Sequence, residues 1–579
     1  MARRAGKRFR TGGPPSSRGP FLQHIQALLD NTPHERLKGH LLARAKALPA
    51  GERLDFLRML GEGEPRPSPM GPGLLANIDE FIAALRRDDY ADDAWADEPE
   101  WVDEFEALLS GATRAFVDGE RTLAAAALGR LLRVFDLGGE VAAFCGEEPA
   151  ELQVRSELGE ALAFHLRALY DTTPLQRRAA RLLEEIIALQ GIGSTRVGLE
   201  AIMNADPDPP ADWVEFLPQW LEAVRGWETD SDDLSRDVRG FLVREATRHV
   251  AGADGLGELA RSEGRDDAQH YHEWLDALLD ADRRGDAVAA AREAVGAVAE
   301  PWAKARLADR LTTLALDLGD ESLALEAGRA AWRSRPSPRR LTRLCGVVGR
   351  DGESLRSSLA AEREAARSDE FQPGDRLAAI LDLLLGDLDS ALDRLERAPA
   401  LGWGGGAHPG RILFPCALLA AAGLAAPPER SVLAAWWKEI DGFVDLDDFP
   451  VDDGDGPDDP GLGASTAPAA GSTEPPTLTD MLSASLGRLD LAPAARWRVV
   501  ERLRGIVEKR VDAIVANQHR RAYLRAARLA AAWAEGAALA GNSRSGQEFL
   551  HTLLGRFPRH SAFKREIDSV ARDLVARRR

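Results

Sequence analysis

The chain has 579 residues with a formal net charge of -19, and 6% of its residues are aromatic. This length exceeds what one compact core fills, so the sequence predicts several domains or a stack of repeated units. The negative balance argues against a general affinity for nucleic acid, because phosphate binding depends on a concentrated basic surface. A composition rich in Ala and Leu favours helices over strands.

Cysteine usage and hydropathy indicate the compartment. Cys145, Cys345 and Cys416 are odd in number and far apart, so they offer neither a disulfide framework nor a paired zinc knuckle. The longest apolar stretch, residues 412–426, is shorter than the roughly 20 residues that a membrane span requires. Only seven of the 74 basic residues are lysines, which is typical of GC-rich bacterial genomes. We expect a bacterial, cytoplasmic protein without membrane insertion.

The N-terminal part divides into three segments. Residues 1–20 are basic but lack the apolar stretch of a secretory signal, so we expect a disordered basic tail. Residues 21–60 contain three short amphipathic patterns, which predict a small helical cluster. Residues 61–73 are rich in Pro and Gly and predict a linker.

Residues 74–250 predict a helical region with degenerate repeats. Helical patterns alternate with breaks at residues 138–139, 172–174 and 206–210, and a hairpin is expected around Gly119. An acidic segment from Asp88 to Glu100 precedes Trp101. We interpret it as a solvated loop whose carboxylates favour the start of the next helix, with the indoles packing on the core. The alternative is a docking site for a basic partner or for divalent cations.

A regular period appears further along the chain. Glycines recur at intervals of 34, 33 and 34 residues, each between two helical patterns, and a small residue follows each glycine five positions later. The glycines are Gly285, Gly319, Gly352 and Gly386, and the small residues are Ala290, Ala324, Ser357 and Ala391. Twelve positions after the glycines, Glu364 interrupts an otherwise small series. This period is that of a tetratricopeptide array.

The pattern resembles the tetratricopeptide family over residues 270–400. Trp274 and Pro336 also match positions where that family has an aromatic residue and a closing proline. The resemblance implies an all-α fold, a right-handed α-solenoid of helical hairpins with flanking helical domains, and an array over residues 251–440. One hairpin cannot bury its apolar face alone, so hairpins stack and form a groove that binds a partner.

The remainder of the chain predicts a linker and a last domain. Residues 441–477 are rich in Asp, Pro, Gly, Ser and Thr, and cannot offset their chain entropy by burial. We predict a disordered acidic linker before a C-terminal helical domain, residues 478–579. Gly541 and Pro558 in that domain share the 17-residue offset of Gly319 and Pro336.

Two segments, residues 135–170 and 401–415, resemble an uncharacterised group of bacterial helical-repeat proteins, some of which are associated with SWIM-type zinc fingers. The zinc motif of that group, Cys-x-Cys followed by Cys-x-His, is absent from this sequence. The resemblance therefore implies neither a metal site nor nucleic-acid binding here.

Histidine motifs give no catalytic assignment. His34 and Glu35 begin like a zincin helix, but Lys38 stands where the second metal ligand is required. His270 and His272 would point about 200° apart on a helix, which prevents chelation by the pair. We interpret them as part of the entry into the helix that contains Trp274.

The loop from Gly402 to Gly410 has unusual backbone freedom, and glycine loops can bind phosphate through their amides. It lacks the Gly-Lys-Ser/Thr ending of a Walker loop and follows a helix. Two interpretations remain open: a ligand loop that involves Trp403 and His408, and an irregular connection between helices.

The sequence thus predicts a non-catalytic scaffold or adaptor that binds a partner protein in the repeat groove, without a cofactor or metal. One alternative is an accessory subunit of a nucleic-acid- or nucleotide-dependent system, with the Arg-rich ends contacting phosphates. The other is an enzyme with a site near residues 402–410. No Gly-x-Ser-x-Gly nucleophile motif supports the enzyme.

Overall fold

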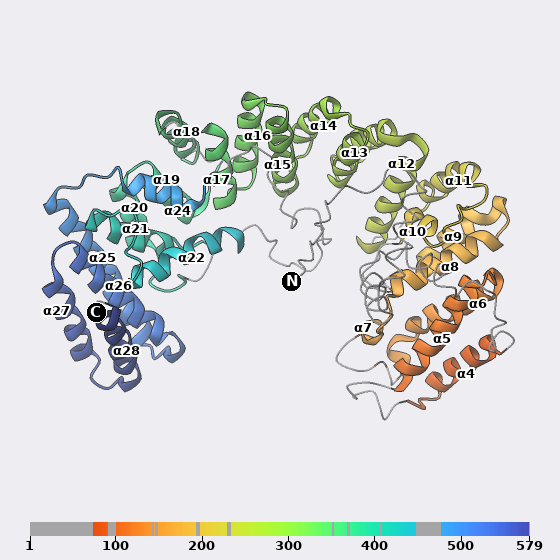
Figure 1. The fold of residues 1–579 in the computed structure, drawn as a ribbon, viewed down its shortest axis with the longest axis horizontal. Coiled ribbons are helices and arrows are strands. Elements are labelled where there is room, and N and C mark those ends of the chain that lie inside the picture. The colour runs from red at the N-terminus through yellow and green to blue at the C-terminus, as the bar shows by residue number, and fades with distance from the viewer. Residues whose placement is uncertain are drawn as a thin grey trace, which may run out of the picture. The chain divides into compact units, whose positions relative to one another are not determined.

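The computed structural model describes a chain made of helices (Figure 1). The described residues are 73–90, 100–141, 144, 149–190, 192, 197–228, 233–349, 352–367, 371–403, 407–446 and 476–577. Within these ranges no strand is present. Successive helices pair as hairpins and pack on their neighbours in chain order. The predicted all-α helical-repeat architecture is confirmed.

Several predictions concern residues outside these ranges. The basic tail, the helical cluster of residues 21–60 and nearly all of the 61–73 linker lie there. So do residues 91–99 of the acidic segment, Cys145, residues 404–406 of the glycine loop and residues 447–475 of the acidic linker.

The chain forms two compact units, residues 1–255 and 256–579, which we call unit 1 and unit 2. The helices of unit 1 are α4 (Leu74–Arg86), α5 (Glu100–Val117), α6 (Arg121–Leu132), the 3-10 helix η3 (Arg133–Glu140), α7 (Ala150–Gln153), α8 (Leu158–Thr172), α9 (Leu175–Ala188), α10 (Leu199–Asn204) and α11 (Trp213–Arg225). Helix α12 (Asp233–Glu263) crosses the boundary between the units and is interrupted at Gly252. The predicted breaks at 138–139, 172–174 and 206–210 coincide with helix ends or, at Gly138, with a non-helical residue.

Aromatic side chains fill the core of unit 1. Trp101 and Phe105 are fully buried, and their ring centroids lie 6.3 Å apart. Phe216 and Trp220 stack in α11 at 5.9 Å. Trp213, Trp220 and Trp227 are spaced by seven residues in the sequence, but Trp227 lies beyond the end of α11, so the three do not all belong to one helix.

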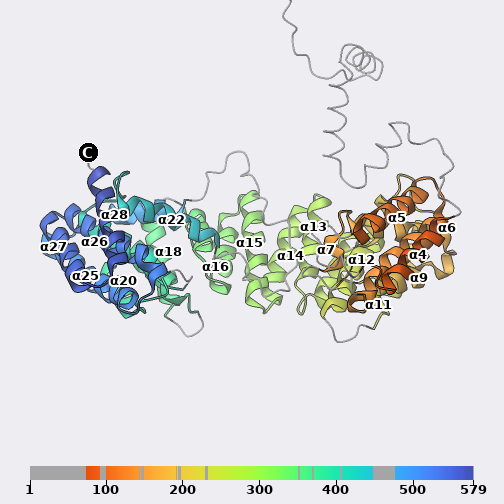
Figure 2. The same cartoon turned by 90° about the horizontal axis from the view of Figure 1, so that it is seen from below.

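Unit 2 begins with four hairpins, which Figures 1 and 2 show in green and turquoise. They pair α13 (Gln269–Asp280) with α14 (Arg284–Ala297), α15 (Pro301–Asp317) with α16 (Glu321–Ser334), α17 (Pro338–Val348) with α18 (Gly352–Ala365), and α19 (Gly374–Leu384) with α20 (Leu388–Arg397). We call α13, α15 and α17 the first helices, and α14, α16 and α18 the second helices. Each helix packs on the next along the chain.

The evenly spaced glycines do not occupy equivalent positions. Gly319 and Gly386 lie in the turns of their hairpins with φ of 75° and 81°. Gly285 and Gly352 instead lie in the first turns of α14 and α18, which differs from the expectation that each glycine separates two helices. The left-handed positions before those helices are Asp282, with φ of 54°, and Gly349, with φ of 90°. Asp and Gly tolerate this conformation better than most residues, so the turns form at shifted positions.

The small residues show the same difference. Ala290, Ala324 and Ala391 are buried where helices approach each other closely. Ser357, expected to be their counterpart in the third hairpin, is exposed, and its neighbour Ser358 is buried instead. The third hairpin therefore follows a shifted register.

The end of unit 2 is a helical bundle. Its helices are α21 (Gly410–Ala422), α22 (Val432–Leu446), α24 (Leu478–Leu486), α25 (Pro493–Val515), the 3-10 helix η5 (Arg520–Ala522), α26 (Tyr523–Leu539), α27 (Ser543–Arg556) and α28 (Ser561–Arg577). The predicted hairpin that turns at Gly541 is formed by α26 and α27.

One hydrophobic core extends from Trp332 in α16 to Val570 in α28. Helix α24 packs on α17, α19 and α22, and the Ser485 hydroxyl donates to the Leu383 carbonyl at 2.7 Å. The helices after residue 478 are therefore continuous with the end of the repeat array, whereas the sequence suggested a domain separated from it. The expected separation failed because apolar faces on α19 to α22 are covered by helices far along the chain.

Candidate binding surface

Ion pairs connect helix α12, the second helices α14, α16 and α18, and the start of helix α20 in chain order. In each pair the arginine belongs to the earlier helix in the sequence and the carboxylate to the later one. The pairs are Arg261 of α12 with Glu293 of α14 (2.9 Å), Arg292 of α14 with Glu326 of α16 (3.1 Å), Arg333 of α16 with Glu362 of α18 (2.9 Å), and Arg363 of α18 with Asp387 at the start of α20 (3.1 Å). We call this series the second-helix ladder.

The rung at Glu362 is buried. The side chain of Glu362 is 0% exposed. Its carboxylate forms ion pairs with two arginines of α16, Arg333 at 2.9 Å and Arg329 at 3.4 Å. The hydrogen bond to Glu362 raises the pKa of Arg333 above its usual value. This carboxylate keeps α16 and α18 together where the third hairpin departs from the repeat pattern.

A second series of ion pairs connects the first helices. In this series the arginine belongs to the later helix and the carboxylate to the earlier one. Arg310 of α15 bonds to Asp276 of α13, and its Nη1 donates to the His272 carbonyl at 3.3 Å. Arg340 of α17 pairs with Asp309 of α15 at 2.9 Å. We call this series the first-helix ladder. It places α13, α15 and α17 side by side with their charged faces adjoining.

Arg343 adds a further contact between α17 and α15. Its Nη1 lies 3.4 Å from a carboxylate oxygen of Asp309, and its Nη2 donates to the Thr313 hydroxyl. Burial lowers the pKa of Arg343, while Asp309 acts in the opposite direction. An arginine remains protonated despite such a shift, so α17 presents a cation that is held in place.

The residues of both ladders were not identified from the sequence, although the sequence contains a signal. Arg292 and Glu326 are 34 residues apart, and so are Arg310 and Asp276. Opposite charges separated by one repeat would have predicted contacts between neighbouring hairpins.

The structure brings Trp403 and His408 together, as the ligand-loop interpretation required, but packs them against each other. Their ring centroids lie 5.5 Å apart in a stacked arrangement, and Arg510 covers the Trp403 ring at 4.5 Å. His408 Nδ1 accepts from the Gly410 amide at 2.9 Å, so Nε2 carries the proton and donates to the Pro399 carbonyl at 2.8 Å. Both ring nitrogens are thus used by the protein. Burial lowers the pKa of His408, which favours this neutral form.

Gly410 allows the Trp403 ring to pack closely against the backbone. A Cβ at this position would lie 2.6 Å from the Trp403 ring, so only glycine allows the indole to rest on the start of α21. The contacts of Trp403, His408 and Gly410, which flank residues 404–406 outside the described ranges, fit a connection between helices.

The histidines of α13 also have internal roles. His270 and His272 are 3% and 5% exposed. His272 Nδ1 lies 3.2 Å from Arg310, while His270 Nε2 faces the carboxylates of Glu263 and Asp267 at 3.8 and 3.6 Å. Across the described residues no group of three or more His, Cys, Asp or Glu side chains could hold a metal ion.

A cavity of about 310 Å³ lies at α18, α19 and α20. Arg363, Arg367 and Arg394 line it together with Asp375. Arg363 and Arg394 both pair with the buried carboxylate of Asp382, at 3.7 and 2.9 Å. Because carboxylates already balance these arginines, the cavity does not form a strong anion site.

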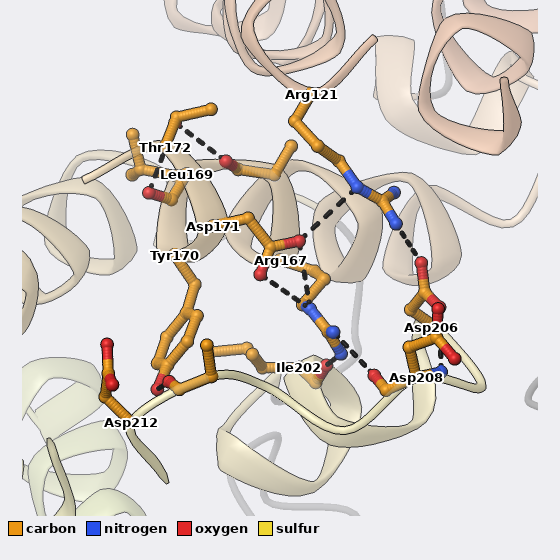
Figure 3. Close-up of polar contacts among 12 residues, drawn as sticks. Arg121, Arg167, Leu169, Tyr170, Asp171, Thr172, Ile202, Asp206, Asp208 and Asp212 are labelled. Atoms are coloured by element: carbon orange, nitrogen blue, oxygen red, sulfur yellow. Dashed lines mark hydrogen bonds and ion pairs between the residues drawn. The ribbon is translucent and has the colours of Figure 1, made fainter. Parts of the chain in front are cut away.

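Unit 1 contains a polar network that joins α6, α8 and the segment between α10 and α11 (Figure 3). Arg121 pairs with Asp171 at 3.4 Å and bonds to Asp206, whose side chain is 1% exposed. The Arg121 guanidinium also covers the Phe116 ring at 3.8 Å. Figure 3 shows Arg121 between the carboxylates of Asp171 and Asp206.

The same network fastens the segment before α11. Arg167 donates to the carbonyls of Ile202 and Asp208 at 3.3 and 2.6 Å, and the Tyr170 hydroxyl donates to the Ala211 carbonyl at 2.5 Å. These donors satisfy backbone groups that would otherwise be buried without partners. The network therefore has a structural role.

A further buried cluster lies at η3, α8 and α9. Glu185 is 1% exposed. Its carboxylate lies 3.1 Å from His165 and 2.9 Å from both Arg133 and Arg181. Burial raises the pKa of Glu185, but the hydrogen bond and charge of His165 and the two arginines outweigh it, so the pKa lies below its usual value. A Cβ at Gly129 would lie 2.7 Å from His165, so glycine is required for this approach.

The two cysteines in the described ranges are buried and free. Burial raises the pKa of Cys345 to about 12 and raises the pKa of Cys416 as well. Both thiols are therefore protonated at neutral pH and poorly nucleophilic. Among the described helices none is long and apolar enough to cross a membrane.

Comparisons with known proteins add little. No protein-family model matches the chain, and no curated protein does. One matching solved structure is a circular tandem repeat protein with novel repeat topology and enhanced subunit contact surfaces. It is 15% identical, with 92% of this chain and 96% of that chain covered at a TM-score of 0.15. A TM-score this low does not indicate a shared fold, and the helical-repeat architecture is shown by the hairpins of the chain itself.

Proposed function

We propose that this protein is a non-catalytic scaffold that binds a segment of a partner protein across the first helices α13, α15 and α17. The first-helix ladder carries this proposal. It holds charged side chains of α13, α15 and α17 in adjoining positions. The side chains of Asp276, Arg310 and Arg343 are 52%, 23% and 36% exposed, whereas that of Arg340 is 10% exposed.

Such a surface is suited to recognition because its charged groups are already positioned. Asp309 fixes two arginines of α17, and Asp276 fixes Arg310 of α15. A partner would therefore meet side chains that lose little conformational freedom on binding. Hairpin stacks commonly present binding surfaces of this kind.

Deletion of the array is a poor test, because α19 and α20 share a core with the C-terminal helices. We suggest instead the double variant Arg306→Glu with Arg339→Glu, which reverses charge on α15 and α17. Arg306 is half-buried and covers the Trp302 ring at 4.6 Å, and Arg339 is exposed. Arg521→Glu with Arg559→Glu is the matched control, since both residues are exposed in the C-terminal bundle. The full chain and both variants would be used to capture partners from the source organism, with mass spectrometry as the measurement.

We expect the first variant to lose an abundant partner that the wild-type chain and the control retain. Equal retention by all three proteins would place the partner elsewhere and contradict the proposal. Circular dichroism of each protein ensures that loss of the partner does not result from unfolding.

A further inference from the structure

Positive charge is concentrated in the last helices of unit 2. Residues 493–579 contain 19 Lys and Arg residues and 8 Asp and Glu residues, although the whole chain has a net charge of -19. Some of these basic side chains pair with carboxylates; Arg502 Nε, for example, lies 2.6 Å from a carboxylate oxygen of Glu396. Arg510 of α25 and Arg525 of α26 form no ion pair with a carboxylate among the residues that the structure describes. Their charges are therefore not balanced within that part of the chain.

Arg510 is buried and is held in place by neutral groups. The residue is 9% exposed. Its Nη1 donates to the Ala400 carbonyl at 2.7 Å, and its guanidinium covers the Trp403 ring at 4.5 Å. These contacts fix the orientation of the guanidinium without supplying a counter-charge. Burial, followed by the charges of Arg525 and Arg411, lowers the pKa of Arg510 to about 10, so the side chain stays protonated at neutral pH.

Arg411 and Arg525 lie near Arg510. The charges of both act on the Arg510 guanidinium, and the helices that carry the three residues, α21, α25 and α26, all pack on one another. The side chain of Arg411 is 35% exposed and pairs with Glu439 at 3.3 Å, whereas Arg525 is exposed. We call Arg411, Arg510 and Arg525 the arginine cluster. It combines one arginine that is paired with a carboxylate and two that are not.

Two helix ends add to the positive potential at the arginine cluster. Arg411 lies in the first turn of α21 and Arg525 in the first turn of α26, and neither turn contains an acidic residue. Helix N-termini carry partial positive charge, so acidic side chains are favoured there and a cation raises the local free energy. The cavity at α18 to α20 differs, because Asp375 and Asp382 pair with its arginines. At the arginine cluster an anion from outside the chain would supply the missing negative charge.

We infer that the arginine cluster binds a phosphate monoester. Arg510 and Arg525 leave two positive charges, and a phosphate monoester carries a charge of about -1.5 to -2 at pH 7. A planar guanidinium donates two parallel hydrogen bonds to phosphate oxygens, and an oriented side chain such as Arg510 loses little freedom when it does so. A carboxylate would balance only one of the two charges. Long nucleic acid fits less well, because the remainder of the chain is acidic.

The arginine cluster is separate from the proposed scaffold surface, since it lies outside α13, α15 and α17. Failure of either proposal leaves the other standing. Arg411 and Arg525 are accessible to solvent, so the phosphate can belong to a phosphorylated side chain of another protein or to a small phosphate ester. The chemistry that the cluster recognises is the same in both cases.

The probe for the test is a fluorescent peptide, Gly-Ser-Gly-phosphoserine-Gly-Ser-Gly, and the comparison peptide has Glu in place of phosphoserine. Fluorescence anisotropy with the full chain at low salt measures both affinities. The higher charge and the additional acceptor oxygens of the phosphate predict about tenfold tighter binding of the phosphopeptide. Equal affinities, or no change in anisotropy up to about 0.3 mM protein, would overturn the inference.

Substitutions with opposite effects test the assignment to the arginine cluster. Arg525→Ala lowers the affinity for the phosphopeptide about tenfold, whereas Arg565→Ala, on the exposed surface of α28, leaves it unchanged. Glu439→Gln removes the carboxylate that pairs with Arg411 and raises the affinity. Arg510→Lys keeps the charge but loses the two parallel hydrogen bonds, so it lowers the affinity.

Circular dichroism of each variant checks folding. The side chains at positions 525 and 439 are exposed, so their variants keep the test valid if Arg510→Lys unfolds the chain. Equal losses of affinity in Arg525→Ala and Arg565→Ala would contradict the assignment.

Competition identifies the source of the phosphate. Free phosphoserine and unlabelled phosphopeptide are each added to the complex of the chain with the fluorescent peptide. Displacement at equal concentrations assigns recognition to the phosphate alone, as in a small ester, whereas displacement at lower concentrations of the peptide assigns it to a phosphorylated protein segment. Tighter binding of a single-stranded oligonucleotide than of the phosphopeptide would reject the inference in favour of nucleic acid.

Discussion

Unit 1 and the repeat array of unit 2 connect their helices by different means. In unit 1 two of the carboxylates that connect helices are buried: the Asp206 and Glu185 side chains are each 1% exposed. In the array some rungs of the ladders are open to solvent; Arg292 and Glu326, for example, are 62% and 63% exposed. Removing one partner of a buried pair leaves an uncompensated charge, whereas an exposed pair is replaced by water. We therefore expect the buried networks to contribute more to stability than the open rungs, whose charged groups are exposed to solvent.

The largest effect is expected in unit 1. Arg167→Ala removes the donors for Asp171 and for two backbone carbonyls, so we expect a loss of about 3–5 kcal/mol in the free energy of unfolding. Urea denaturation followed by circular dichroism measures it. Arg177→Ala on exposed α9 surface is the control and should change stability little. Equal effects of both variants would show that the network does not stabilise unit 1.

A comparison within the second-helix ladder comes next. Glu362 is fully buried and accepts from Arg333, so Glu362→Ala should cost about 1.5–3 kcal/mol. Glu326→Ala affects an exposed rung and should cost about 0.2–1 kcal/mol. Urea denaturation of both variants gives the difference. The reverse order would mean that burial does not distinguish the rungs.

The turn positions allow a test with opposite signs. Gly319→Ala places a side chain at a φ of 75° and should destabilise the chain by about 1–2 kcal/mol. Gly285→Ala lies inside the first turn of α14 and should stabilise it by up to about 0.5–1 kcal/mol. Thermal unfolding measures both changes. Destabilisation of similar size by both substitutions would indicate that Gly285 also lies in a turn and not inside α14.

The smallest expected effect is a change in acid sensitivity, because Glu185 is one of 93 acidic residues. Its pKa in the folded state lies below the ordinary value of 4.5. The stabilisation is therefore fully present above pH 4.5 and is lost as the pH falls through the lower folded-state pKa. Stability measured from pH 7 to pH 3 should fall less steeply in Glu185→Gln than in the wild-type chain. Parallel curves would contradict this assignment.

The sequence predicted local features well. Amphipathic periodicity and breaks at Gly119, at 172–174 and at 206–210 correspond to helix ends, because helices and turns depend on nearby residues. The repeat period was also visible. Its exact positions were not, since Asp282 and Gly349 take the left-handed conformation in two hairpins where Gly285 and Gly352 were expected to mark the turns.

The candidate surface required the tertiary structure. Asp276 and Arg310 are each ordinary charged residues in the sequence, and their contact appears only when two hairpins stack. Trp403 and His408 formed a plausible ligand pair until packing showed that the protein itself uses both rings.

The sequence by itself determined that this chain forms helices, that hairpins recur at about 34 residues and that its surface is acidic. These properties follow from composition and local periodicity. Only the tertiary structure decided which charges pair and where the core ends. Ser485 bonds to a carbonyl 102 residues earlier, and Glu535 accepts from the Val432 amide 103 residues earlier. Contacts at such separations depend on how apolar faces cover one another in space, which no local pattern encodes.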